Sequence, residues 1–264
     1  MDTEPQTTII RQPRVYLVGR QEIDDAELAR FLADEGVERW SSDTDVAGQK
    51  LVEVAGRLCY TSYARPRPGG NATYIGHILE VGHGSVLEHA VFNFILTGVS
   101  RSLTHELVRH RAGWSYSQLS QRFVDESRCA FVEPDAIAED PELHRIWVEA
   151  IASSQRAYRE LAEALAAKFT ELDDKTLRRK RAREAARSVL PNATETKIFV
   201  TANARALRNF LELRGSRHAD AEIRKVALEI LRVLQAEAPH IVPDFQVVEL
   251  GGSEWEITNT FKKV

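Results

Sequence analysis

The sequence lacks several features that would place it in a familiar class at once. It has two cysteines in 264 residues, too few for a disulfide framework. It has no run of 18 apolar residues and no basic-then-apolar N-terminus, so we expect neither a transmembrane helix nor a secretory signal. The net charge is −4, which does not favour non-specific nucleic-acid binding. We therefore expect a cytoplasmic protein with no membrane and no nucleic-acid partner.

Common cofactor motifs are also missing. The chain contains neither Gly-x-Gly-x-x-Gly nor Gly-x-x-x-x-Gly-Lys-[Ser/Thr], so any dinucleotide must be held in another way. His83 and His89 are six positions apart, and His105 and His110 are five apart. Neither pair shares a helix face at the spacing of metal ligands. We therefore predict no metal site.

Neither cysteine has the surroundings of a nucleophile. Cys59 follows an apolar helical stretch over 51–58, which favours a place in the core. Cys129 follows Arg128, whose charge could lower the pKa of the thiol. The core position is the simpler interpretation of Cys59, and we assign no catalytic role to either residue.

Hydrophobic periodicity predicts many helices and few strands. We expect a polar tail over 1–12 and a mobile basic loop over 65–70, where prolines and glycines cluster. We expect strands at 15–18, 90–99 and 196–202, and helices at 24–33, 45–60, 72–81, 100–111, 141–172, 175–188, 204–213 and 219–237. This order predicts an α+β fold: a single domain over 13–264 with long helices packed on a small, mostly antiparallel sheet.

The segment 109–122 concentrates arginine, histidine and serine around a glycine. It contains three arginines and three serines in fourteen residues. Guanidinium groups and hydroxyls suit the oxygens of a phosphate. A solvated basic helix end followed by a polar loop explains the same spacing equally well. The segment by itself leaves both interpretations open.

Residues 203–214 give an informative helical projection. Leucine, alanine and phenylalanine form an apolar stripe that includes Leu213, with Arg208 and Glu212 opposite it and Arg205 and Asn209 stacked one turn apart. Arg214 falls inside the apolar stripe, where a dry guanidinium requires a partner. A ligand-facing role is favoured over a simple C-terminal cation.

Four segments occur in an order that resembles a known family. They are Gly-His-Gly-Ser-Val-Leu-Glu-His-Ala at 82–90, Arg-His-Arg…Ser-Gln-Leu-Ser-Gln-Arg at 109–122, Ala-Arg-Ser-Val-Leu-Pro at 186–191 and Asn-x-Arg-x-x-x-Asn-x-x-x-x-Arg at 203–214. Together they resemble the flavin-dependent thymidylate synthases. One departure is that eight residues, 112–119, separate Arg-His-Arg from Ser120, one more than is usual in the family. Gln118 stands where the family also uses glutamate, so no general-base role is expected there.

The resemblance implies conversion of dUMP to dTMP with FAD, NADPH and methylene-tetrahydrofolate, without a cysteine nucleophile. It implies that Arg214 is catalytic, because it favours the N3-ionised uracil. The cofactor-binding residues implied are Ser85, Arg109, His110, Arg111, Gln118, Asn203, Ala204, Arg205 and Asn209. The dUMP-binding residues implied are Glu106, Leu107, Val108, Arg109, Gln118, Leu119, Ser120, Gln121, Arg122, Arg187 and Arg214.

The resemblance also implies a homotetramer with active sites at subunit interfaces. Two alternatives remain open at this point. One is a regulatory nucleotide-binding protein that kept the anion pocket and lost catalysis. The other is a helical oligomeric scaffold whose arginines are surface charge.

Overall fold

The computed structural model describes residues 7–37, 40–64, 68–252 and 254–264. Their contacts divide the chain into two compact units. The first unit comprises the described residues within 1–14, 96–108 and 117–198, and the second comprises those within 15–95, 109–116 and 199–264. Each unit is built from several segments of the chain, and the single domain over 13–264 stays a prediction. None of the described helices is both long and apolar enough to cross a bilayer.

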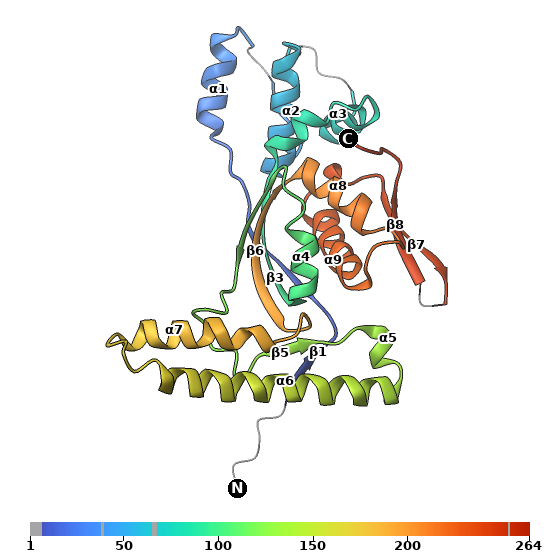
Figure 1. The fold of residues 1–264 in the computed structure, drawn as a ribbon. Helices are drawn as coiled ribbons and strands as arrows, with labels where there is room; N and C mark the ends of the chain where they lie inside the picture. Colours follow the sequence, from blue (N-terminus) through green and yellow to red (C-terminus); the bar gives the residue numbers. More distant parts are fainter. Residues whose placement is uncertain (1–6, 38–39, 65–67, 253) are drawn as a thin grey trace. The chain divides into compact units, whose positions relative to one another are not determined.

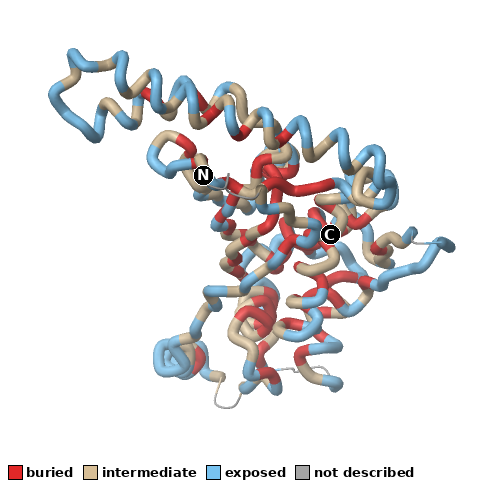
Figure 2. Tube along the Cα trace, turned by 90° about the horizontal axis from the view of Figure 1, so that it is seen from below, coloured by how far each residue is buried: buried red, intermediate tan, exposed pale blue. Residues whose placement is uncertain are grey.

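Two helices side by side dominate the first unit, α6 (Pro141–Lys168) and α7 (Lys175–Ala186) (Figure 1). Asp140 caps α6 by accepting bonds from the backbone nitrogens of Glu142 and Leu143 at 2.8 and 3.2 Å, with proline at the first helical position. Along α6 buried, half-buried and exposed residues alternate (Figure 2), as the 3.6-residue period predicts. Both predicted helices are confirmed. Helix α6 ends at Lys168, four residues before the predicted end at 172, and α7 is followed by a 3₁₀ turn over Arg187–Val189 (η2).

Short elements complete the first unit. Strand β1 (Thr8–Ile10) pairs in parallel with β5 (Ala130–Val132), and α5 (Asp135–Ala138) follows. Phe131, buried with Cys129 and Ile151, forms a core between β5 and α6. The tail predicted over 1–12 is therefore wrong from Thr8 on, because that segment completes a strand pair; residues 1–6 lie outside the described residues.

The second unit begins with strand β2 (Arg14–Gly19). Three helices and a 3₁₀ helix follow: α1 (Asp25–Asp34), α2 (Ala47–Cys59), α3 (Gly70–Glu80) and η1 (Gly84–His89). The core side of α2 contains Val52 and Gly56. Cys59 in its last turn is exposed, so its predicted place in the core is wrong. Of the loop predicted at 65–70, residues 65–67 lie outside the described part of the chain.

The C-terminal part of the second unit is mainly helical. Helices α8 (Ala204–Arg214) and α9 (Ala221–Glu237) appear where the periodicity predicts them. A 3₁₀ turn (Pro239–Ile241, η3) leads to the antiparallel strands β7 (Phe245–Gly251) and β8 (Glu254–Asn259). The sequence analysis assigned no structure to this hairpin, in which β7 is largely exposed and β8 is largely half-buried.

Strands β2, β3 (Val91–Ser100), β6 (Glu195–Asn203) and β4 (Trp114–Gln118) form a four-stranded sheet in that order. β3, β4 and β6 carry the chain from one unit into the other. Together with the antiparallel hairpin, this sheet and the long helices confirm the predicted α+β fold. The β1–β5 pair is a parallel exception.

Strand β4 corrects the predicted polar loop after the Arg-His-Arg triplet. Helix α4 (Arg101–Leu107) is capped by Ser100 as predicted, but it ends before the triplet. The carbonyl oxygen of His110 accepts a 2.7 Å hydrogen bond from the hydroxyl of Tyr116 in β4. This bond comes from a side chain of the strand and not from a helical backbone nitrogen. The triplet therefore follows the helix and is not part of it, and its two arginines are exposed.

Candidate functional site

The predicted phosphate-binding residues form a tight turn in the first unit. The carbonyl oxygen of Ser120 accepts bonds from the backbone nitrogens of Phe123 and Val124 at 3.2 and 3.0 Å. Arg122 is 43% exposed, and its Nε lies 2.9 Å from an oxygen of Glu184 on α7. The turn thus presents a hydroxyl and a guanidinium on one short segment, which we call the phosphate loop (120–124).

Gln121 in the phosphate loop is buried, yet its amide nitrogen has no hydrogen-bond partner among the described residues. A buried donor without an acceptor costs about 1–3 kcal/mol. This donor therefore fits a loop that lacks its ligand. Nearby, the Gln118 amide nitrogen donates to the hydroxyls of Thr104 and Thr196 at 3.2 and 3.3 Å. That arrangement makes Gln118 a link between strand and helix.

Other predicted dUMP residues of the first unit surround a buried polar group. Arg101, which the sequence analysis did not select, donates to the carbonyl oxygen of Leu119 at 3.0 Å. Its guanidinium also lies 3.9 Å from the buried Glu126. Burial raises the pKa of Glu126, and the charge of Arg101 opposes that rise. Burial lowers the pKa of Arg101, to which the positive charge of Arg187 also contributes.

Glu106, Leu107 and Val108 lie at the end of α4 and just after it, where Leu107 is fully buried and Val108 is 37% exposed. The Leu107 side chain therefore packs in the core, and its predicted dUMP contact stays a prediction.

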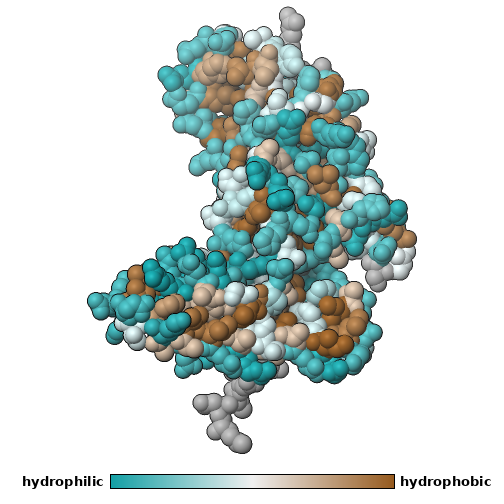
Figure 3. All heavy atoms as spheres, viewed as in Figure 1, coloured by the Kyte–Doolittle hydropathy of each residue, from teal (hydrophilic) through white to brown (hydrophobic). Residues whose placement is uncertain are grey.

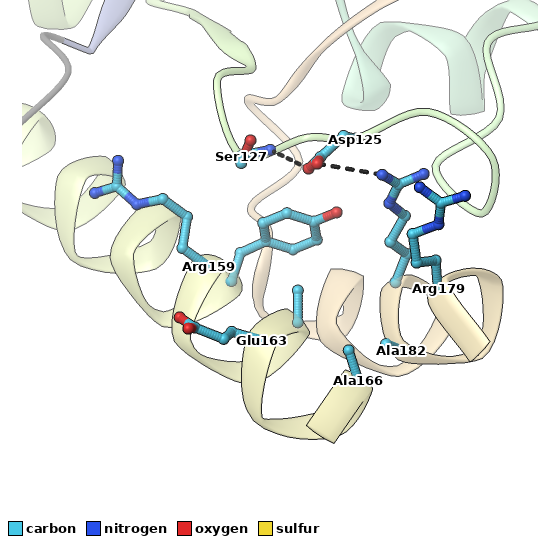
Figure 4. Close-up of a pocket in the computed structure, with 10 residues that line it drawn as sticks. Asp125, Ser127, Arg159, Glu163, Ala166, Arg179 and Ala182 are labelled. Carbon is cyan, nitrogen blue, oxygen red and sulfur yellow. Dashed lines mark hydrogen bonds and ion pairs between the residues drawn. The ribbon is translucent and has the colours of Figure 1, made fainter. Parts of the chain in front are cut away.

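A cavity of about 250 Å³ lies between α6, α7 and the segment after the phosphate loop. Figure 4 shows Arg159 and Glu163 on α6, with Arg179 on α7 beside the guanidinium that is bonded to Asp125. That guanidinium belongs to Arg183, which lies 3.2 Å from Asp125 and donates to the carbonyl oxygen of Phe123 at 2.7 Å. The lining of this cavity combines arginine and carboxylate side chains with three alanines, Ala162, Ala166 and Ala182. This cavity contains none of the predicted site residues, and we assign it no ligand.

The predicted flavin-binding residues of α8 line a cavity in the second unit, of about 280 Å³. We call it the α8 cavity; its lining is Glu88, Ala112, Gly113, Asn203, Arg205, Ala206, Asn209, Lys263 and Val264. Arg205 and Asn209 are exposed there, and Arg205 lies 2.6 Å from the carboxylate of Glu88. The structure thus brings together three of the predicted cofactor residues around one hollow.

Asn203 and Gly113 form the back of the α8 cavity. The Asn203 side chain caps α8 by accepting a 2.9 Å bond from the backbone nitrogen of Ala206. Gly113 has φ +75°, and a Cβ there would lie 2.6 Å from the Asn203 amide nitrogen. A side chain at position 113 would therefore displace the cap. Ala204 is fully buried, so its side chain supports the helix from inside.

The remaining predicted flavin contacts do not line this cavity. Ser85 is exposed on η1, and Arg109 and Arg111 are exposed in the segment before β4. Their side chains are exposed on the same unit and do not line the cavity. Their flavin contacts stay predictions.

Arg214 and His110 form a pair. Nε of Arg214 donates a 3.0 Å hydrogen bond to Nε2 of His110. Burial, and secondarily the charge of Arg214, lowers the pKa of His110 to about 4. His110 is thus neutral near pH 7, with its proton on Nδ1, and it is enclosed by the rings of Trp114 and Phe210, whose centroids lie 6.0 and 5.2 Å away. A neutral acceptor holds Arg214 in place and leaves its positive charge uncompensated by this partner.

Arg208 is a correction to the helical projection. It is 2% exposed instead of facing solvent, and it makes two bonds of 2.8 and 3.1 Å to Asp244. It also donates to the carbonyl oxygens of Ile241 and Phe261 at 2.8 and 3.2 Å. Glu212 on the same side accepts a bond from the backbone nitrogen of Lys263. Leu213, predicted within the apolar stripe, is 53% exposed. The C-terminal segment covers the face that the projection assigned to water.

The sequence analysis assigned no nucleophilic role to either cysteine, and the surroundings of Cys129 are consistent with that. Burial raises the pKa of Cys129 to about 12, and Glu126 adds to this rise. The direction is opposite to the one that a nearby Arg128 would give, and it agrees with assigning no catalytic role to Cys129. Cys59 is a free, exposed thiol. Among the described residues, no group of three or more histidine, cysteine, aspartate and glutamate side chains could hold a metal.

A dinucleotide fits the second unit in part. The α8 cavity offers arginine, lysine and side-chain amides, which are the groups that bind phosphate and ribose oxygens. Its volume of about 280 Å³ lies just below the ~300–1,000 Å³ of ligand sites. It therefore suits one portion of such a cofactor, with the remainder held by other surfaces.

Comparison with known proteins places these residues in a family. Residues 43–240 match the family model described as thymidylate synthase complementing protein. The flavin-dependent thymidylate synthase of Mycolicibacterium gilvum is 52% identical over 239 residues, which is 90% of this chain and 91% of that protein. The protein of the same description from Mycolicibacterium vanbaalenii is 54% identical over 213 residues, or 80% and 84% of the two chains.

Solved structures share the fold. The UMP/dUMP methylase PolB from Streptomyces cacaoi, bound with 5-Br dUMP, superposes with a TM-score of 0.63 at 23% identity. The match covers 89% of this chain and 94% of that one. This likeness extends beyond the residues of the family model and includes both units.

Proposed function

Because the chain belongs to the family of flavin-dependent thymidylate synthases, we propose that it methylates dUMP to dTMP. The observation that carries this proposal is the 52% identity over 90% of the chain, together with the ordered motifs. The site geometry supports it: each unit holds one group of the predicted residues, the phosphate loop in the first and the α8 cavity with Arg214 in the second.

The phosphate loop would bind the phosphate of dUMP. Ser120 offers a hydroxyl, Arg122 a guanidinium at the surface, and Gln121 a buried amide without an acceptor. A phosphate supplies acceptors for all three. Binding would draw Arg122 from Glu184, an exchange between two exposed anionic partners that costs little.

Arg214 would act on the uracil ring. A fixed cation beside the N3–H group stabilises the ionised ring, which makes the ring carbon more nucleophilic. One of its partners is a neutral His110, which positions the guanidinium and does not itself neutralise its charge. FAD, when bound, would supply reducing equivalents taken from NADPH, and methylene-tetrahydrofolate would supply the carbon. Neither thiol is required.

We further propose a homotetramer with active sites at subunit interfaces. Exposed apolar side chains support assembly: Leu143 (45%), Ile146 (51%) and Leu161 (38%) on α6, and Phe123 (61%) in the phosphate loop. Figure 3 shows hydrophobic surface running along the helical pair of the first unit. Apolar surface of this kind is typical of faces that are covered by another chain. Size-exclusion chromatography with light scattering measures the assembly; a monomer would contradict this part.

The test of the activity is spectroscopic and chemical. The purified protein should be yellow, lose its flavin absorbance with NADPH, and form dTMP only when methylene-tetrahydrofolate and dUMP are both present. A protein that binds dUMP by calorimetry but shows no turnover would indicate a regulatory binder. A protein that binds neither FAD nor dUMP would indicate a scaffold, and either result would contradict the proposal.

A further inference from the structure

The α8 cavity has a wall that none of the sequence motifs includes. Lys263 and Val264 line it beside Asn203, Arg205 and Asn209. These two residues lie 23 and 24 positions beyond the end of the family match at residue 240. They belong to a segment, 261–264, that follows strand β8 and brings Val264 against Gly84 of η1. We call this segment the strap.

The strap is fixed at several points. The backbone nitrogen of Phe261 donates to Asp244 at 2.9 Å, and the carbonyl oxygen of Phe261 accepts bonds from Arg208 and Asn259 at 3.2 and 2.8 Å. The backbone nitrogen of Lys263 donates to Glu212 at 3.0 Å. Arg208 and Asp244 are themselves buried as an ion pair. The strap is therefore anchored to α8, the helix that supplies the cavity's other polar groups.

The close fit of the strap is also specific. A Cβ at Gly84 would lie 2.7 Å from the carbonyl carbon of Val264 and 3.0 Å from Nε of Arg205. Gly84 thus allows η1 to contact the strap and Arg205 together. Lys263 has φ +56°, a left-handed conformation that is unfavourable for a residue with a side chain. The bond from its backbone to Glu212 holds it there. A strained lysine at a cavity wall points to a role for that position.

Charge decides which ligand the wall suits. Arg205 is already paired with Glu88 at 2.6 Å, so these two side chains nearly cancel. The ammonium of Lys263 has no ion-pair partner within the described residues. Lys263 thus places a second cation on the wall of the cavity. An ammonium opposite two side-chain amides suits a phosphate ester.

We propose that Lys263 is a further cofactor-binding residue, which contacts the diphosphate of FAD from the strap. This proposal deepens the proposed function and rests on it. It adds a second cation to a site where the motif arginine, Arg205, is largely neutralised. It also explains why the strap is anchored so firmly to α8 through Arg208 and Glu212.

The test compares Lys263→Ala with Lys262→Ala in the full-length protein. Lys262 is the matched control, since it is an adjacent exposed lysine whose ammonium bonds to Asn259 at 2.6 Å and which does not line the cavity. Apoprotein is titrated with FAD and with riboflavin, which lacks phosphate, and flavin fluorescence gives each Kd at two salt concentrations. NADPH binding to the FAD-loaded protein is measured in parallel.

We expect Lys263→Ala to bind FAD about tenfold more weakly, the usual loss for one charge-assisted bond, with a smaller salt dependence. Riboflavin binding and the Lys262→Ala variant should match wild type. Equal FAD affinity in Lys263→Ala and wild type would overturn the assignment while leaving the proposed function in place. A loss that extends equally to riboflavin, or one confined to NADPH, would also overturn it. A wild-type protein that binds no flavin would overturn both proposals.

Discussion

The arginines around the phosphate loop and two arginines of α8, Arg208 and Arg214, are held by different kinds of partner. Around the phosphate loop, Arg122 is paired with Glu184 and Arg183 with Asp125, and all four side chains reach the solvent. In the second unit Arg208 is paired with Asp244 out of contact with water, and Arg214 is bonded to a neutral histidine. An arginine in an exposed ion pair can exchange its carboxylate partner at little cost, whereas a buried ion pair holds the segments that it joins in place.

This difference matches what each region would have to do. A phosphate loop has to release its arginine to an incoming anion, so a weak pair is suitable. A cation that polarises a ring has to stay in one place with its charge available, so a neutral partner in a half-buried pocket is suitable. The predictions below test whether the second unit depends on its arginines far more than the first.

The largest effect on stability is expected for Arg208→Ala. It leaves Asp244 buried without its partner and removes two bonds to backbone oxygens. Breaking a buried pair on one side costs about 3–5 kcal/mol, measured as the loss in free energy of unfolding by urea denaturation. Arg217→Ala, an exposed arginine after α8, is the control and should change stability little. A loss below about 1 kcal/mol, the range of exposed pairs, would show that the burial of Arg208 is unimportant.

Arg208 also shows where prediction from sequence reaches its limit. The periodicity of 204–213 located α8 correctly, because that signal is local. The projection placed Arg208 on the solvent side, since a charged residue away from the apolar stripe usually faces water. Its partners, Asp244 and Phe261, are 36 and 53 positions away. Contacts of that range leave no periodic trace in the sequence.

The sequence analysis missed strand β4 for a different reason. Trp114, Tyr116 and Gln118 are half-buried and alternate with two exposed serines, so a period of two was present. The segment is only five residues long and polar, and it follows a glycine. A segment this short and polar is predicted as a loop from sequence, because its pairing with β6 is not visible there. The motifs selected the candidate residues from sequence alone, but the carboxylates paired with Arg205 and Arg122, Glu88 and Glu184, become evident only in the structure.

Arg214→Ala is expected to have the largest effect on activity. Removing a preorganised donor at a developing charge lowers kcat by about 10²–10³-fold. The fold should survive, because the residue is the last of α8 and is only half-buried. Arg217→Ala again serves as the control, and circular dichroism checks the fold. Near-normal dTMP formation in Arg214→Ala would remove its assigned role.

The pair of His110 and Arg214 predicts a dependence of stability on pH. The folded pKa of about 4 lies below the ordinary value of 6.5, so the unfolded chain takes up this proton first as the pH falls. The stability from neutral His110 is complete above pH 6.5 and is lost between 6.5 and 4. His110→Gln keeps an acceptor for Arg214 and does not titrate. The stability of wild type relative to this variant should fall by about 2–3 kcal/mol across that window; a difference that is independent of pH would rule out the pair.

Ser120→Ala tests the phosphate loop directly. Loss of one hydroxyl contact should weaken dUMP binding by about 1–3 kcal/mol, which calorimetry measures as a rise in Kd. Ser117→Ala provides the comparison, as an exposed serine on the neighbouring strand β4 outside the loop. Unfolding should be the same in both variants. If dUMP binds equally to Ser120→Ala and wild type, the loop does not hold the phosphate.

The smallest effect is expected for Arg183→Ala, and it completes the comparison. Arg183 bonds the carbonyl oxygen of Phe123 and Asp125 from α7, so it positions the phosphate loop without belonging to it. The pair is partly exposed, and its loss should cost at most about 1 kcal/mol of stability. The Kd for dUMP should rise a few-fold while kcat at saturating dUMP stays unchanged, since a displaced loop weakens binding and leaves Arg214 in place. Arg179→Ala, one turn away on the same helix and without a contact to the loop, should leave the Kd unchanged. A stability loss as large as that of Arg208→Ala would mean that the first unit, too, depends on a fixed arginine, and the contrast between the two units would disappear.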